Sequence, residues 1–255
     1  MTDQTTRATA FAALHVKGDP VVLFNIWDAG SARTVAKAGA KALATGSWPV
    51  AAAFGYGDGE KIPLDLALDN IRRIVAGTDL PVTMDLEGGY GVSPREVEVT
   101  VARAAEAGAI GINFEDQILG GDGLYAMAVQ AERVGAARNA FDNAGIAGFV
   151  NARTDIFLKN KPDTHSPDML AEAIARAKTY AEAGADGFFA PGLADASMIE
   201  TLCAEISLPV NIIALPGVPD KATLSRLGVA RISYGPVPYR QMMASLDAAA
   251  KAAFA

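Results

Sequence analysis

The stretch from Pro81 to Gly91 reads PVTMDLEGGYG and holds the residues with the clearest chemical potential. Its first half is an apolar run typical of a strand buried on both faces, and it ends in Asp85 and Glu87. Because side chains alternate along a strand, both acids point to the same side. Neighbouring carboxylates repel each other unless a cation joins them, so the stretch predicts a divalent metal bound by oxygen ligands. The three glycines that follow would let a ligand approach the backbone.

Eight short apolar runs share one pattern of flanking residues. The phrase Ala-Gly-Ala occurs at 38–40, 107–109 and 183–185, after a helical pattern and before an apolar run, and 227–229 is a looser copy. Glycine at this position closes a helix in the left-handed conformation before the next strand begins. The predicted strands cover residues 21–28, 41–47, 81–87, 109–116, 148–155, 187–192, 209–215 and 230–235.

Amphipathic segments separate these strands, and two of them, 93–107 and 166–183, begin with Ser followed by Pro, as helices often do. Strands alternating with helices imply a parallel sheet, and eight such units imply one domain over residues 1–255, a (β/α)₈ TIM barrel. An open doubly wound sheet is the alternative, but no glycine fingerprint follows the first strand. We expect residues 1–10 to be poorly ordered, and residues 239–255 to form a C-terminal helix that packs on the barrel or on a neighbouring subunit.

Composition narrows the class of protein. At 255 residues and 51% hydrophobic, the chain can bury one enzyme-sized core. A formal charge of −7 without a basic cluster argues against nucleic acid or an anionic membrane as partner. The only cysteine, Cys203, lies in an apolar helical stretch and allows no disulfide, which fits a reducing cytoplasm. The first residues lack the apolar core of a signal peptide, and no apolar run approaches the roughly 20 residues of a membrane span.

Polar residues gather at the predicted carboxyl ends of the strands, the face of such a barrel that carries chemistry. A hard, oxygen-rich pocket there would suit Mg²⁺ or Mn²⁺. Its carboxylates are Asp58, Asp85, Glu87 and Glu115. A network of ion pairs is the alternative, but no lysine shares those strands. Arg153 would neutralise excess carboxylates or stabilise charge on a substrate oxygen. A carboxylate or phosphate could be cradled by the backbone N–H groups and hydroxyls of Thr45, Gly46 and Ser47.

Other polar residues have simpler explanations. Asp28 precedes a helical segment and is expected to cap it. Asp116 could cap a turn, and Asp155 could pair with a neighbouring base. His15 belongs to an N-terminal helical pattern and His165 to a Ser/Pro/Asp loop, so neither resembles a ligand.

From about Phe24 to Gly235 the chain resembles the isocitrate lyase and phosphoenolpyruvate mutase superfamily, in a branch similar to the phosphoenolpyruvate phosphonomutases. The matching segments, in order, are FNIWDAGSAR, ALATGSWPVAAAFGYGDGE, LPVTMDLEGGYG, AGAIGINFED, VNARTD and GADGFFAPGL. The resemblance implies a (β/α)₈ barrel assembled as a homo-oligomer, a dimer or a tetramer in which a C-terminal helix is exchanged.

The resemblance also implies roles for individual residues. It puts a Mg²⁺ site on the four carboxylates, with Asp85 as the direct ligand and the others acting largely through water. It puts the substrate carboxylate at Thr45, Gly46 and Ser47, and the enolate-stabilising arginine at Arg153. Asn211 matches a position that also contacts substrate. The implied substrate is a 2-oxo acid, or a compound that becomes one.

The chain departs from this pattern in the loop after the fourth strand, which reads DQILGGDGLYAMAV. Isocitrate and methylisocitrate lyases carry a Lys and a Cys there, and the mutase and its hydrolase relatives a Lys and an Asn. Ala190 replaces a His or Glu after the sixth strand, and Glu87 replaces the usual aspartate. The metal and enolate residues therefore match better than the residues that set specificity.

Decarboxylation of an oxaloacetate-type acid asks for little beyond the metal and enolate residues, so we expect an Mg²⁺-dependent lyase that breaks a carbon–carbon bond or releases CO₂. Tyr56, Tyr90 and Tyr234 are candidate proton donors to the enolate. Carbon–phosphorus chemistry on phosphonopyruvate is one alternative, against which the missing loop Lys argues. A protein that binds a 2-oxo acid without turning it over is the other.

Overall fold

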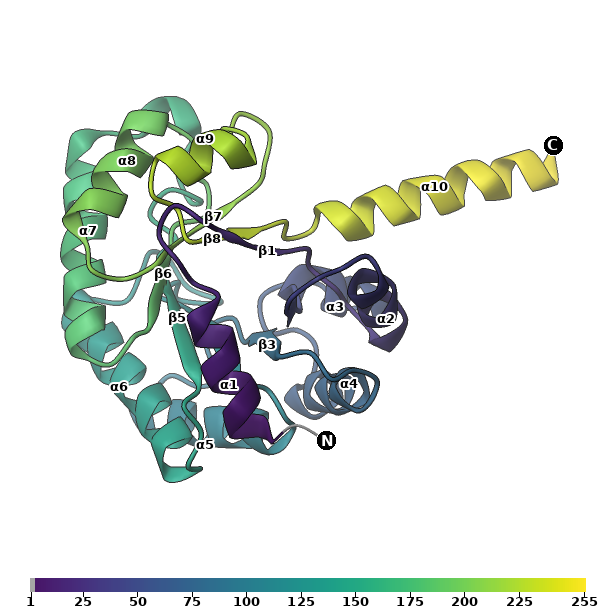
Figure 1. The fold of residues 1–255 in the computed structure, drawn as a ribbon, viewed down its shortest axis with the longest axis horizontal. Helices are drawn as coiled ribbons and strands as arrows, with labels where there is room; N and C mark the ends of the chain where they lie inside the picture. The colour runs from purple at the N-terminus through teal and green to yellow at the C-terminus, as the bar shows by residue number, and fades with distance from the viewer. Residues whose placement is uncertain (1–2) are drawn as a thin grey trace.

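Eight parallel strands form the centre of the computed structural model, which describes residues 3–255. They are β1 (Val21–Leu23), β2 (Leu43–Ala44), β3 (Val82–Asp85), β4 (Gly111–Glu115), β5 (Phe149–Arg153), β6 (Gly187–Phe189), β7 (Val210–Ile213) and β8 (Arg231–Ser233). They pair in the order β1-β8-β7-β6-β5-β4-β3-β2, and a bridge between Ile26 and Thr45 joins the two ends. The result is a nearly closed (β/α)₈ TIM barrel, which confirms the predicted fold and all eight strands, each shorter than its apolar run (Figure 1).

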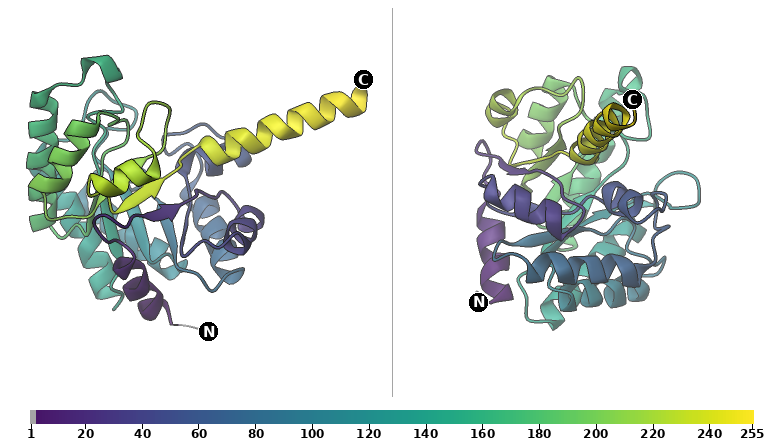
Figure 2. Two further views of the ribbon diagram at one scale, coloured as in Figure 1. Left: turned by 45° about the horizontal axis from the view of Figure 1, so that its top comes forward. Right: turned by 90° about the vertical axis from the view of Figure 1, so that its right-hand side faces the viewer.

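Helices flank the strands in the chain, and all except α1 and α10 form the outer ring of the barrel (Figure 2). They are α1 (Gln4–Ala13), α2 (Ala29–Lys37), α3 (Ser47–Ala53), α4 (Leu64–Ala76), α5 (Pro94–Glu106), α6 (Met127–Asn143), α7 (Pro167–Glu182), α8 (Ala196–Glu205), α9 (Lys221–Arg226) and α10 (Val237–Phe254), with a short 3₁₀ turn, η1, at Pro162–Thr164. Ser93 caps α5 and Ser166 caps α7, as predicted. Gly39, Gly108 and Gly184 have φ of +97°, +101° and +101°, which confirms the left-handed helix ends. Within residues 3–255, no helix is long and apolar enough to cross a membrane.

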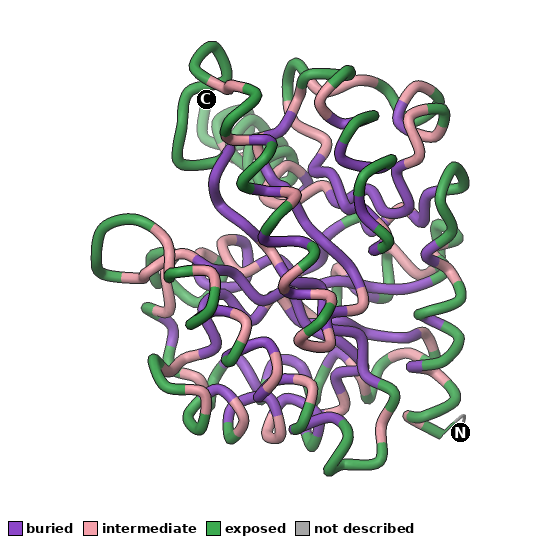
Figure 3. Tube along the Cα trace, turned by 90° about the vertical axis from the view of Figure 1, so that its left-hand side faces the viewer, coloured by how far each residue is buried: buried purple, intermediate pink, exposed green. Residues whose placement is uncertain are grey.

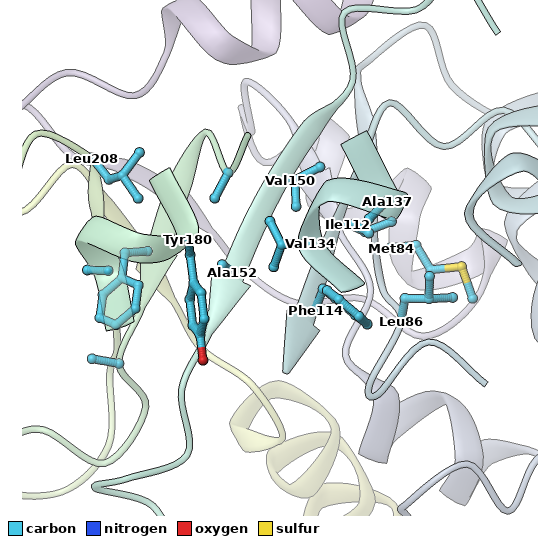
Figure 4. Packing of buried hydrophobic residues seen from close by; sticks show 14 of the residues in the cluster. Met84, Leu86, Ile112, Phe114, Val134, Ala137, Val150, Ala152, Tyr180 and Leu208 are labelled. Carbon is cyan, nitrogen blue, oxygen red and sulfur yellow. The ribbon is translucent and has the colours of Figure 1, made fainter. Parts of the chain in front are cut away.

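The strands separate a polar interior from an apolar outer layer. Ile112 and Phe114 of β4 pack outward against Val134 and Ala137 of α6 (Figure 4). The alternate residues of the strands point into the barrel and are mostly polar: Thr83, Asp85, Asn113, Glu115, Asn151, Arg153, Asn211, Arg231 and Ser233. Buried backbone gathers in these central strands, whereas the connecting loops are exposed (Figure 3). The fold therefore encloses hydrogen-bonding groups that the carboxyl-end face can use.

Helix α1 lies against the amino-terminal end of the barrel. Ala8 and Phe11 pack in one apolar cluster with Phe149 of β5, and Gln4 Nε2 donates to the carbonyls of Ala105 and Ala109. The expectation of poor order is therefore wrong for residues 4–10, because buried contacts hold this helix. Residues 1 and 2 of that prediction lie outside the described part of the chain.

Helix α10 extends away from the barrel, which is plain in both views (Figures 1 and 2). It begins at Val237, two residues before the predicted start at 239, and Pro238 is its only buried residue. The expectation that it covers the barrel of its own chain is wrong, since most of its apolar side chains face solvent. Packing on a neighbouring subunit stays a prediction.

Candidate active site

A cavity of about 290 Å³ opens at the carboxyl ends of the strands. Its polar lining comes from β4, from the ends of β1, β3, β5 and β8, from the segment after β2 and from the first turn of α10. These polar lining residues are Asn25, Ser47, Asp58, Asp85, Asn113, Arg153, Ser233 and Arg240. The apolar walls are Trp48, Pro49, Leu158, Phe189, Pro191, Ile213, Leu215 and Pro236. A site of this size and mixed chemistry suits a small polar ligand.

Asp85 ends β3 with one carboxylate oxygen engaged and one free. Its backbone N–H donates to Thr45 Oγ1 at 3.0 Å, and its Oδ2 accepts from the Ser47 N–H at 3.0 Å. Its Oδ1 is buried and has no hydrogen-bond partner among residues 3–255. Asp58, from the loop after α3, lines the same cavity, and burial followed by the Asp85 charge raises the pKa of its carboxyl. A buried acceptor without a donor calls for a cation or an ordered water.

Glu87 sits just beyond β3 in a left-handed conformation, with φ of +53°. Its Oε2 accepts from the backbone N–H groups of Gly59 and Glu60, both at 2.8 Å, while Glu60 Oε1 accepts from the Tyr90 N–H at 2.7 Å. Burial raises the pKa of Glu87 to about 7. Asp85 and Glu87 also line a second, much smaller cavity of about 10 Å³, at the lower limit of what can hold one water. Glu87 thus ties the loop after α3 to the end of β3.

Arg153 forms a buried cluster with two acids. Its Nη1 lies 2.8 Å from Glu115 Oε2, and its Nε and Nη2 donate to the two carboxylate oxygens of Asp155 at 2.6 and 2.9 Å. The Glu115 backbone N–H donates to the carbonyl of Glu87 at 2.9 Å, so the predicted acids converge on one face. Burial raises the pKa of Glu115, and the Arg153 charge opposes that shift. Arginine therefore supplies the neutralising charge that no lysine on these strands provides.

The residues fit a hard divalent cation held by few carboxylates. Within residues 3–255, no three His, Cys, Asp or Glu side chains form a group that could enclose a metal alone. Mg²⁺ does not need such a cage, since it binds one or two carboxylates and keeps several waters. The free Asp85 Oδ1 and the neighbouring Asp58 offer such a donor set, and neither cavity is lined by Cys or His.

The backbone cradle predicted at 45–47 is wrong in one respect. The N–H groups of Thr45 and Gly46 already donate to the carbonyls of Thr83 and Ile26, because the chain continues to pair beyond the end of β2, and the N–H of Ser47 donates to the Asp85 carboxylate. Gly46 and Ser47 line the larger cavity and Thr45 the smaller one. Any ligand contact here would fall to the Ser47 hydroxyl rather than to backbone amides.

Four other predicted residues lie outside the larger cavity. Tyr56 is 38% exposed on the loop after α3, and Tyr234 packs on Phe24. Tyr90 lines the smaller cavity, where burial and neighbouring acids raise the pKa of its phenol. Asn211 accepts from the Ser233 hydroxyl at 3.1 Å, and its Nδ2 is buried without a partner in the described chain. A role for these side chains stays a prediction.

The simpler explanations are confirmed for Asp28 and for Asp155, which pairs with Arg153, but not for Asp116. Asp28 caps α2 in a capping box. Asp116 is buried and accepts hydrogen bonds from side chains of α7, so it does more than end a turn. Cys203 is buried in the core, His15 stacks on an aromatic ring beneath the barrel, and His165 bonds to backbone carbonyls of its own loop.

Sequence reasoning missed several lining residues. Asn25 Nδ2 donates to the Thr45 carbonyl, and its Oδ1 accepts from the N–H groups of Tyr234 and Gly235, so it joins the ends of β1, β2 and β8. Its place inside an apolar run was the available signal. Arg240 carried no such signal, because nothing in the sequence shows that the first turn of α10 reaches the cavity.

A model of the phosphoenolpyruvate phosphomutase family matches residues 11–254. The chain belongs to this family. It is therefore a member of the isocitrate lyase and phosphoenolpyruvate mutase superfamily of lyases and mutases, as the resemblance implied. This homology identifies it as an enzyme.

Relatives of this family member fall into several kinds. The crystal structure of a Burkholderia cenocepacia protein, assigned provisionally as a phosphonomutase, is 49% identical, with a TM-score of 0.96 over 98% of this chain and 100% of that one. An uncharacterized Mycobacterium tuberculosis protein is 36% identical over 96% of this chain and 87% of its own. The 2-methylisocitrate lyase of Escherichia coli is 29% identical over 79% of this chain and 67% of its own, and oxaloacetate decarboxylases also match. Because these relatives catalyse different reactions, homology does not identify the reaction of this protein.

Proposed function

We propose that the protein is a Mg²⁺-dependent lyase that makes or breaks a bond next to a 2-oxo acid through an enolate. Its substrate is a small 2-oxo or 2-hydroxy dicarboxylate, and Mn²⁺ can replace Mg²⁺. The observation that carries this proposal is the free, buried Asp85 Oδ1 in a cavity that also presents Asp58 and Arg153. The kinship with 2-methylisocitrate lyase and oxaloacetate decarboxylases supports the same class of reaction.

Asp85 would hold the cation directly, and Asp58, Glu87 and Glu115 would orient its waters. When bound, the cation supplies Lewis-acid polarisation of the 2-oxo acid. Arg153 faces the cavity as a guanidinium fixed by two carboxylates, so it can stabilise negative charge on a substrate oxygen without moving. The Ser47 hydroxyl would contact the substrate carboxylate.

Carbon–phosphorus chemistry is the second candidate. The family model and the likeness to the Burkholderia protein favour it. The loop between β4 and α6 argues against it, since DQILGGDGLYA lacks the Lys and Asn that the resemblance requires there. A bond between carbon atoms therefore remains the proposed target.

The protein would act as a homo-oligomer, a dimer or tetramer, on a small molecule alone. The exposed apolar side chains of α10 support this part of the proposal. Those of its central turns, Met242, Met243 and Leu246, are 41%, 39% and 57% exposed.

The reaction can be tested by incubating the protein and Mg²⁺ with oxaloacetate, methyl-branched malates or phosphonopyruvate and measuring pyruvate. We expect pyruvate above the metal-only rate from a dicarboxylate, and its loss when EDTA is added. Pyruvate from phosphonopyruvate alone would select the second candidate. A mutase would instead convert phosphonopyruvate into phosphoenolpyruvate, so formation of neither pyruvate nor phosphoenolpyruvate from any of the three above the metal-only rate would contradict both.

A further inference from the structure

A series of hydrogen-bonded charged residues runs from the active-site cavity into the outer layer of the barrel. Arg153 lines the cavity, and Asp155 holds it through both carboxylate oxygens at 2.6 and 2.9 Å. The backbone N–H of Asp155 donates in turn to Asp116 Oδ1 at 3.0 Å. Asp116 Oδ2 accepts from Arg176 Nη1 and from the Tyr180 hydroxyl, both at 3.1 Å. The series therefore begins with one arginine at the cavity and ends with another on α7.

The two carboxylates in the middle of this series lie fully inside the protein. Asp116 and Asp155 are both 0% exposed. Neighbouring buried carboxylates repel each other, and a buried charge is strongly destabilising without a partner. Each carboxylate has its own arginine, since Arg153 pairs with Asp155 and the buried Arg176 pairs with Asp116. Without Arg176, the charge of Asp116 would push Asp155 away from the position in which it holds Arg153.

Tyr180 aligns the outer end of the series. Its hydroxyl accepts from Arg176 Nη1 at 2.9 Å and donates to Asp116 Oδ2. Its buried ring packs in the apolar layer around the strands (Figure 4), with its centre 6.4 Å from that of the Phe188 ring in β6. A ring fixed by packing gives the hydroxyl one position, so it holds the guanidinium and the carboxylate in register.

The same arginine holds the end of the loop between β4 and α6. Arg176 Nη1 donates to the Tyr125 carbonyl at 3.0 Å, and the Tyr125 N–H donates to the Asp116 carbonyl at 2.8 Å. A bridge between Gln117 and Leu124 closes the loop next to this point. Both backbone groups of Tyr125 are therefore bound to the Asp116–Arg176 pair.

We propose that Arg176 is a positioning residue: through Asp116 it fixes the Arg153 guanidinium and ties it to the end of the β4–α6 loop. This inference rests on the proposed function, in which Arg153 stabilises charge on a substrate oxygen. That stabilisation requires a fixed geometry, so a small displacement of the guanidinium weakens it. Partners that orient the ligands of a metal site contribute about tenfold to a hundredfold to affinity or activity, and we expect an effect of this order here.

Arg138 on α6 offers a matched control at the opposite end of the barrel. Its Nη1 pairs with Asp186 Oδ2 at 3.1 Å, and that oxygen accepts from the N–H of Val150 in β5 at 2.8 Å. Arg176 is arranged in the same way, with an aspartate between its guanidinium and a backbone N–H just after β5. Val150 lies near the amino-terminal end of β5, whereas the cavity opens at the carboxyl ends of the strands. Replacing Arg138 therefore removes a similar contact without affecting Arg153.

Calorimetric titration with oxalate in the presence of Mg²⁺ measures how well Arg153 is placed. We expect Arg176→Met to weaken oxalate binding about tenfold to a hundredfold. Tyr180→Phe, which keeps the ring but not the hydroxyl, should weaken it less. Arg138→Met should leave the Kd within about twofold, as for an independent site. In an Arg153→Lys background, Arg176→Met should add no more than about twofold, because its effect passes through Arg153.

Hydrogen–deuterium exchange tests the link to the loop. Residues 117–125 should exchange faster in Arg176→Met than in the wild type, because the Tyr125 backbone loses one of its two fixed partners. Arg138→Met should leave this exchange unchanged. Urea unfolding shows which variants are folded. Should Arg176→Met fail to fold, Tyr180→Phe provides the same comparison.

The outcomes separate this inference from the function on which it rests. Equal oxalate affinity in the wild type, Arg176→Met and Tyr180→Phe would overturn the role of Arg176 and leave the proposed function intact. Equal losses in Arg176→Met and Arg138→Met, or full additivity with Arg153→Lys, would also overturn it. Unchanged exchange of residues 117–125 would contradict the link to the loop. Failure of the wild type to bind oxalate with Mg²⁺ would overturn the proposed function and this inference with it.

Discussion

At the scale of single residues, buried polar groups carry most of the information about this protein. His15 shows this outside the active site. Its ring stacks on Phe149 with centres 4.1 Å apart, its Nδ1 faces the Phe11 carbonyl at 2.9 Å, and its Nε2 has no partner in residues 3–255. Burial, followed by the positive charge of Arg231, lowers the pKa of His15 from 6.5 to about 3. The folded protein therefore holds this imidazole neutral.

That shift predicts a pH-dependent loss of stability. Between pH 6.5 and about 3 the unfolded chain binds a proton at His15 that the folded chain does not, so the free energy of unfolding should fall as the pH falls, by up to about 1.4 kcal/mol per unit. His15→Phe should remove the His15 contribution to the slope between pH 6.5 and 5, where Glu87, with its pKa raised to about 7, contributes with the opposite sign in both proteins. Urea unfolding at several pH values measures it, with His165→Gln as control. An unchanged slope in His15→Phe would show that His15 does not cause it.

At the scale of elements, loops after the strands are positioned by close backbone contacts as well as by hydrogen bonds. Gly192, after β6, has φ of +88°, and a Cβ there would lie 2.8 Å from the Leu158 backbone nitrogen. Leu158 lines the active-site cavity, so this contact sets one of its walls. Gly217, after β7, has nearly the same φ, +89°, but has no atom within 4 Å of its Cβ position.

These two glycines separate backbone strain from steric contact. Gly217→Ala should cost only the left-handed conformation, about 1 kcal/mol. Gly192→Ala should cost about 1–3 kcal/mol more, because Leu158 backbone atoms must also move. Chemical denaturation of both variants gives the difference. Equal losses in the free energy of unfolding would mean that the loop at Leu158 moves without cost and does not fix the cavity wall.

Much of this arrangement was predictable from the order of elements. Apolar runs, Ala-Gly-Ala helix ends and Ser-Pro caps gave the barrel, and the barrel brought Asp85, Glu87 and Glu115 to one face, as observed. Other features depend on contacts between segments far apart in the chain. The backbone amides of 45–47 were expected to be free, yet strand pairing uses those of Thr45 and Gly46, and the Asp85 carboxylate accepts from that of Ser47. The polar inward residues Asn113 and Arg231, 118 positions apart, gave no local sign that they bond to each other.

At the scale of the whole molecule, α10 is the element that the single chain leaves without a partner. It projects from the barrel with only Pro238 buried, whereas the helices that surround the barrel pack their apolar side chains against it (Figure 1). A long helix whose apolar side chains face solvent costs free energy unless another surface covers them. A second copy of the chain is the proposed partner, consistent with the homo-oligomer.

This proposal predicts that charge on α10 disrupts assembly. Leu246→Lys should shift the protein toward smaller species in sedimentation velocity, because a charge would be buried against the neighbouring subunit. Val99→Lys on α5 is the matched control, since Val99 is 56% exposed and Leu246 57%. A monomeric wild type, or an identical distribution in Leu246→Lys, would contradict the assignment of α10 as the contact.

The whole account rests on a divalent cation held at Asp85 that recruits the 2-oxo acid end of a substrate. Calorimetric titration of the protein with oxalate, with Mg²⁺ and after EDTA treatment, tests this most directly. We predict oxalate binding with Mg²⁺, none after EDTA, and none in Asp85→Asn, which keeps the size of the side chain but not its charge. Oxalate binding that survives EDTA, or that Asp85→Asn retains with Mg²⁺ present, would contradict the account.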